Sequence, residues 1–148
     1  MALNRRKWIT TMAAAGAAAL LPLRLLADTA AAFKAADATT ALKQLFGDLP
    51  VEVSTAIEFK IPDIAENGAV VPVTVATDLP GVQNISIVVD ENPNPLSASF
   101  NISPEAFADV STRVKMGNSS MVHAYVRTAD KVYTTSKEVK VTIGGCGG

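Results

Sequence analysis

The sequence predicts an all-β fold: an immunoglobulin-like antiparallel β-sandwich of about seven strands, with a short N-terminal helix and a flexible C-terminal arm. Three observations support this fold class. Short runs rich in Val, Ile and Thr recur between residues 51 and 143, turns such as Asn67-Gly68 and Pro80-Gly81 separate them, and no helical period intervenes. The 148 residues of the chain are enough for one domain.

Seven runs within residues 51–143 are expected to be the strands of the sandwich. In the last run Val139, Val141 and Ile143 alternate with polar residues, which is typical of a strand with one buried face. The expected strands cover residues 57–61, 70–77, 85–90, 96–102, 110–116, 121–128 and 131–143. Because the Cys…Trp…Cys signature of immunoglobulin domains is missing, packing alone must hold the two sheets together.

A helical segment, residues 33–50, precedes the strands. Asp37 can cap a helix that begins at the next residue, and Gly47 can end it. Leu42 and Phe46 fall on one face of that helix, which predicts that it packs on a neighbouring layer.

Residues 1–27 have the pattern of a twin-arginine signal peptide. Arg5-Arg6 precede the bulky apolar Trp8, and a weakly hydrophobic, Ala-rich stretch follows until a proline and an arginine interrupt it. This stretch is shorter than the about 20 apolar residues of a transmembrane helix, so we expect no membrane association after cleavage. Cleavage after Ala27, or as late as residue 32, would release the chain into the bacterial periplasm.

The composition of the chain argues against nucleic-acid binding and against a metal centre. From Asp28 onward nine basic residues face 14 acidic ones, a formal charge of −5, whereas phosphate binding depends mainly on Lys and Arg. One His, one Cys and one Trp leave too few ligands for a multi-His or Cys-rich metal centre, and no metal site or cofactor is predicted. His123 lies in an alternating run, where a half-buried or surface position is expected rather than a catalytic or metal-binding role.

The residues suited to chemistry lie in the C-terminal arm, Gly144, Gly145, Cys146, Gly147 and Gly148. Glycine has the widest accessible backbone map and no side chain to pack, so four glycines predict an arm that stays flexible and keeps its thiol exposed. Five extended residues span at most about 17 Å, which is enough for the thiol to enter a cleft in another protein. These properties suit a carrier whose bound group is processed elsewhere.

The thiol of Cys146 is expected to be poorly activated within this chain. An ordinary cysteine has a pKa near 8.5, so only about 3% of it is thiolate at pH 7. The glycines beside it carry no cation, and the nearby C-terminal carboxylate opposes ionisation. We therefore hypothesise that activation comes from the active site of a partner protein.

With this ending, the β-rich domain and the twin-arginine signal, the chain resembles the SoxY family, the sulfur-carrier subunits of periplasmic thiosulfate oxidation. Residues 61–73 are similar to the family's first-hairpin segment, Asn92-Pro93-Asn94-Pro95 to its mid-domain turn, and residues 139–148 to its ending. The resemblance implies that Cys146 bears the substrate covalently and that the chain is a carrier rather than an enzyme.

The resemblance also implies protein partners. A second β-sandwich subunit, SoxZ, would pair with this chain. A haem-containing SoxAX enzyme would couple thiosulfate to the thiol, SoxB would hydrolyse the terminal sulfone off as sulfate, and in some pathways a sulfane dehydrogenase would oxidise the remaining sulfur.

Two other functions remain open on the sequence alone. The chain could be a periplasmic interaction protein in which Cys146 only forms an intermolecular disulfide, since an odd cysteine in an exported protein is compatible with this role. It could also be a carrier that forms a thiocarboxylate at Gly147-Gly148. The export signal, the β-rich pattern and the cysteine third from the end count against the second alternative.

Overall fold

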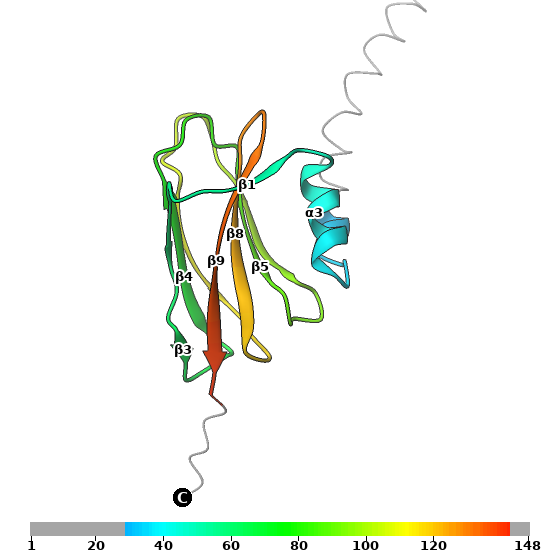
Figure 1. Ribbon diagram of the computed structural model, residues 1–148, viewed down its shortest axis with the longest axis vertical. Coiled ribbons are helices and arrows are strands. Elements are labelled where there is room, and N and C mark those ends of the chain that lie inside the picture. The colour runs from blue at the N-terminus through cyan, green and yellow to red at the C-terminus, as the bar shows by residue number, and fades with distance from the viewer. Residues whose placement is uncertain (1–28, 143–148) are drawn as a thin grey trace, which may run out of the picture.

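The computed structural model describes residues 29–142. The predicted signal peptide (residues 1–27) and the C-terminal arm (residues 144–148) lie outside the described residues. Two β-sheets face each other, and a helix covers the outer face of the larger sheet (Figure 1). Within residues 29–142 no helix has both the length and the hydrophobicity needed to cross a membrane.

The helix of the outer layer, α3, spans Ala38–Phe46, inside the predicted helical segment. Asp37 is its N-cap, because Asp37 Oδ1 accepts a hydrogen bond of 2.8 Å from the backbone N–H of Thr40. Gly47 ends the helix with φ at 63°, in the left-handed region where glycine is favoured. The cap and the end that the sequence predicts for this helix are therefore confirmed.

The described residues form nine strands in two sheets. The larger sheet has the order β1-β9-β8-β5-β6, with β3 paired to the end of β9, and the smaller sheet has the order β2-β4-β7. The strands are β1 (Val51–Val53), β2 (Ile57–Lys60), β3 (Ile64–Ala65), β4 (Val71–Thr77), β5 (Asn84–Val89), β6 (Leu96–Asn101), β7 (Asp109–Val114), β8 (Ser120–Arg127) and β9 (Val132–Val141).

The main core lies between the two sheets and consists largely of β-branched side chains. Val73 and Val75 of β4 face Ile85 and Ile87 of β5 in this core, and all four are buried. A second, smaller cluster joins Phe46 of α3 to the outer face of the larger sheet. Two sheets that each bury one face define a β-sandwich, so the predicted fold class is confirmed.

Two short strands were not expected from the sequence. β1 and β3 both pair in parallel with β9, β1 at its beginning and β3 at its end. The sandwich is therefore not purely antiparallel. Strands of three and two residues are too short to show an alternating pattern, and their partner lies far along the chain, so only the folded sheet reveals them.

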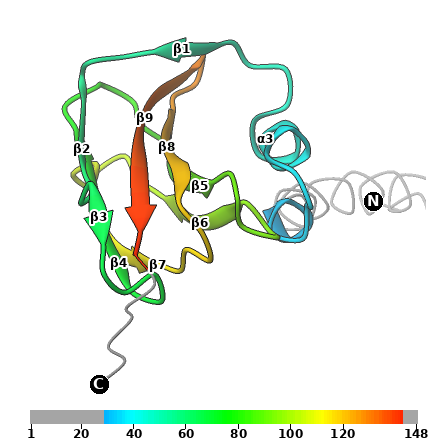
Figure 2. The same ribbon diagram turned by 60° about the horizontal axis from the view of Figure 1, so that its bottom comes forward.

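Strand β9 finishes at an end of the sandwich where three loops gather (Figures 1 and 2). These are residues 61–70 around β3, residues 90–95 between β5 and β6, and residues 115–119 between β7 and β8. Hydrogen bonds between the loops and β9 connect this end, which we call the arm end. The predicted carrier arm follows in the sequence after Thr142, the last described residue at this end.

Candidate functional site at the end of strand β9

The predicted substrate-bearing residue, Cys146, lies outside the described residues, as do Gly144, Gly145, Gly147 and Gly148. Their predicted roles stay predictions. The structure does define the base from which they extend, the last residues of β9 and the loops that hold them. We therefore describe the site from this base.

The last residues of β9 are held on both sides. On one side β3 runs parallel to β9: the N–H of Lys140 donates to the carbonyl of Asp63 at 2.9 Å, and that of Thr142 donates to the carbonyl of Ala65 at 3.1 Å. On the other side the pairing with β8 ends at Val139. Figure 2 shows the end of β9 with β3 on one side and β8 on the other.

Beyond the end of β8, a side chain replaces the strand. The N–H of Val141 donates to Oγ of Ser119 at 2.9 Å. The hydroxyl therefore satisfies a backbone donor that no neighbouring strand reaches on this side, as side chains commonly do where a ladder stops. Ser119 extends the hold on β9 by two residues past Val139.

Gly68 packs closely against this same stretch. A Cβ atom on Gly68 would collide with the carbonyl oxygen of Met116 and lie 2.9 Å from Cγ1 of Val141. The N–H of Met116 also donates to the carbonyl of Gly68 at 2.6 Å. The approach leaves no room for any side chain at this position, so Gly68 locks the loop after β3 against β9 and the loop after β7.

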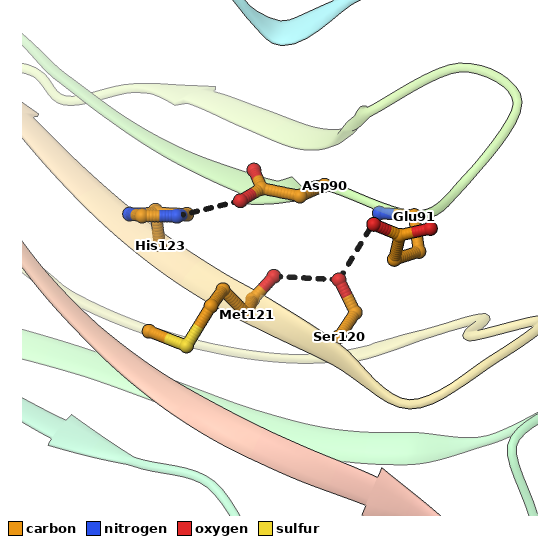
Figure 3. Close-up of polar contacts among 5 residues, drawn as sticks. All are labelled: Asp90, Glu91, Ser120, Met121 and His123. Carbon is orange, nitrogen blue, oxygen red and sulfur yellow. Dashed lines mark hydrogen bonds and ion pairs between the residues drawn. The ribbon is translucent and has the colours of Figure 1, made fainter.

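Asn92 ties the remaining loop into the arm end. Its Nδ2 donates to the carbonyl of Lys115 at 2.7 Å, and its Oδ1 accepts from the N–H of Gly117 at 3.2 Å. The neighbouring Glu91 donates its backbone N–H to Oγ of Ser120 at 3.1 Å (Figure 3). The segments 61–73, 92–95 and 139–142, which are far apart in sequence, therefore meet at one end of the fold.

The charged groups nearest to the base of the arm are of both signs. Lys137 forms an ion pair of 2.8 Å with Asp63 and donates to the carbonyl of Ile61 at 3.0 Å. Lys140 is exposed. Within residues 29–142 no three His, Cys, Asp or Glu side chains gather as a metal site would require.

His123 forms a hydrogen bond with Asp90 and, within the residues that the structure describes, makes no contact with β9 at the arm end. Its Nε2 lies 3.0 Å from Oδ2 of Asp90 on the outer face of the larger sheet (Figure 3), and its ring stacks on Tyr125 with centroids 5.9 Å apart. Burial, and next the charge of Asp90, raise the pKa of Tyr125. The His123 side chain is 24% exposed, which agrees with the half-buried or surface position expected from the sequence.

The register also places His123 far from the thiol. His123 pairs with Ser136, six residues before Thr142, or about 20 Å along the strand. The four residues from Thr142 to Cys146 span at most about 14 Å of backbone. The backbone of Cys146 therefore cannot reach the level of His123, which argues against His123 as its base.

Sequence reasoning missed the residues that hold the base of the arm. Asn67-Gly68 was recognisable as a turn, but its contact with Val141 depends on the tertiary fold. Ser119 bonds a residue 22 positions away, and neither its type nor its neighbours indicate this partner. The similarity of residues 61–73 to a family segment was the available signal, and the structure places part of this segment beside the end of β9.

Comparisons with known proteins agree on the family. The model of the family "Sulfur oxidation protein SoxY" matches residues 42–146. The solved structure of the sulfur carrier protein SoxY from Chlorobium limicola f thiosulfatophilum is 47% identical, with a TM-score of 0.65, and the match covers 71% of this chain and 96% of that one.

A second solved structure is similar in fold alone. The superoxide reductase (neelaredoxin) from Ignicoccus hospitalis is 18% identical, with a TM-score of 0.53, over 59% of this chain and 80% of that one. No curated protein sequence matches. The family match spans most of the chain and includes the position of the single cysteine, so the chain belongs to the SoxY family of sulfur oxidation proteins.

Proposed function

We propose that this chain is a covalent sulfur carrier of periplasmic thiosulfate oxidation, with pathway intermediates bound to Cys146. The observation that carries the proposal is the position of the only cysteine, five residues beyond the end of β9 at Val141, where β3 and Ser119 hold the chain in place. A fixed base combined with a short glycine-flanked extension suits a thiol that is presented to other proteins.

The reaction sequence requires one reactive group from this chain, the thiol of Cys146. Coupling of thiosulfate forms a bond between the Cys146 thiolate sulfur and the sulfane sulfur, and two electrons leave to a haem-containing SoxAX-like enzyme. Hydrolysis by a SoxB-like enzyme then adds water, releases sulfate and two protons, and leaves a persulfide on Cys146. Where a sulfane dehydrogenase takes part, it oxidises the outer sulfur of that persulfide to a sulfonate: three water molecules supply the oxygen atoms, six protons are released, and six electrons pass to the dehydrogenase as the electron acceptor. The carrier supplies the attachment sulfur and its presentation, and the partners supply catalysis.

A SoxZ-like β-sandwich subunit is the proposed stable partner. Among the described strands β1, β2, β3, β6 and β7 each have a paired neighbour on one side only. Such edges present unpaired backbone donors and acceptors that proteins usually cover. Export by the twin-arginine route, which generally carries folded and often assembled proteins, is consistent with a complex that forms before it reaches the periplasm.

The decisive experiment is mass spectrometry of the protein purified from thiosulfate-grown cells, with Cys146→Ser as the test variant and Ser111→Ala as the control. We expect sulfonate, sulfane or thiosulfonate adducts on Cys146 in the wild type and in the control, and loss of thiosulfate consumption in Cys146→Ser cells. Finding disulfide as the sole modification, with thiosulfate still consumed by the Cys146→Ser strain, would favour the cross-linking alternative.

A further inference from the structure

We propose that Gly68 and Ser119 are positioning residues that fix the point from which the carrier arm leaves the domain and thereby set the reach of Cys146. This inference rests on the proposed carrier function. It assigns a role to two residues that do not touch the thiol and that act through the last residues of β9.

Strand β9 extends beyond the end of its partner β8. Its pairing with β8 ends at the pair Ser120 and Val139. Without further contacts, the free chain would begin at residue 140. Instead, residues 140–142 bond to β3 on one side, and Val141 bonds to Ser119 on the other.

The strand that secures this stretch is itself short. β3 has two residues, Ile64–Ala65, and so few backbone bonds give little independent stability. Three contacts add to these bonds: Ala65 is buried in the main core, Lys137 pairs with Asp63, and Gly68 packs on the backbone of Met116, where an added Cβ would also lie 2.9 Å from Cγ1 of Val141. Gly68 is therefore the point at which the loop after β3 packs most closely against both the loop after β7 and the end of β9.

The consequence for the arm is a matter of chain length. With the base held to Thr142, four residues lead to Cys146 and span at most about 14 Å, whereas release back to Val139 leaves seven residues and about 25 Å. The effective concentration of a tethered group falls with about the −3/2 power of tether length, which gives about a twofold loss. The volume within reach of the fully extended arm grows with the cube of its length, which gives about a sixfold loss of effective concentration. Holding residues 140–142 therefore raises the effective concentration of the thiol at the active site of a partner that is bound to this end.

Spin labelling gives a direct test because the chain has a single cysteine. One label is placed on Cys146 and a second on an introduced cysteine at the exposed Glu58 of β2, in the mature full-length chain. We expect Gly68→Ala and Ser119→Ala to broaden the distribution of distances between the labels and to increase the mobility of the label on Cys146. Ser119→Thr keeps a hydroxyl and should restore the narrow distribution.

Two matched controls separate positioning from general destabilisation. Ser111→Ala also removes a bonded hydroxyl, at 2.8 Å from Thr74 on the outer face of the smaller sheet. Gly117→Ala adds a methyl group where nothing lies within 4 Å. Both should leave the distance distribution unchanged. If Gly68→Ala does not fold, Ser119→Ala with its threonine rescue carries the test alone.

The functional readout is thiosulfate coupling by a SoxAX-like enzyme with the carrier as substrate. Gly68→Ala combined with Ser119→Ala should lower kcat/KM by about two- to sixfold, while alkylation by iodoacetamide, a small reagent that needs no docking, keeps its rate. An unchanged distance distribution and an unchanged kcat/KM in folded variants would overturn the positioning role, although adducts on Cys146 would still support the carrier. If Cys146→Ser itself had no effect on thiosulfate consumption, the carrier function would fall instead.

Discussion

Replacement of Gly68 by alanine should destabilise the protein through a collision that the structure locates. The new Cβ would meet the carbonyl oxygen of Met116, which is backbone and cannot rotate away, and Cγ1 of Val141 at 2.9 Å. Overpacking of this kind costs about 1–3 kcal/mol, and the reduced entropy of the unfolded chain returns about 0.4–1 kcal/mol. The balance is about 0–2.6 kcal/mol, and because the obstructing oxygen is backbone we expect its upper part, about 1–2.5 kcal/mol, which corresponds to a fall in Tm of about 4–10 °C for a domain of this size.

Urea denaturation followed by circular dichroism would measure the loss of stability. Gly117→Ala is the control, because its Cβ would have nothing within 4 Å and should change the free energy of unfolding by less than about 0.5 kcal/mol. Equal midpoints for the two variants would refute the argument that close packing at Gly68 holds the arm end together.

Three further predictions follow from individual groups. Ile87→Ala, in the centre of the core, should lower the free energy of unfolding by about 2–5 kcal/mol in urea titrations; Ile64→Ala, at a side chain that is 57% exposed, should cost far less. The backbone N–H of Thr40, and next its side chain, hold the pKa of Asp37 below its ordinary value of 3.8. Its capping contribution is therefore present above that pH and is lost as the pH falls through the lower pKa of the folded state; an NMR titration of the carboxyl that returned an ordinary pKa would contradict this. Alkylation of Cys146 in the isolated protein should accelerate with pH around a midpoint near 8.5, and a midpoint below about 7 would show that the chain activates its own thiol.

The helix was predictable because its signals are local. A capping side chain acts on the residue three positions later, and the terminating glycine acts through its own φ angle. Both effects depend on neighbours in sequence, so no tertiary information was needed. The seven longer strands were predictable for a similar reason, since β-branched runs between turn residues are also local signals; some of these runs alternate, whereas β5 is buried at every position.

The short strands and the arm end were not predictable in this way. β1 and β3 lack a pattern of their own, and they become strands only because β9 offers them a backbone to pair with. Ser119 is an exposed loop serine by every local criterion, and its role follows from the position of Val141.

The sequence by itself determined the family, the sandwich and the residue that is proposed to carry sulfur, because alternation, capping and a glycine-flanked cysteine are all properties of contiguous chain. Only the tertiary structure decided which residues hold the chain at the base of the arm. It brought residues 61–68, 91–92 and 115–119 to the end of β9, where backbone groups left without a strand partner must find bonds elsewhere. Contacts between distant segments depend on how the sheets pack in three dimensions, and no local pattern records them.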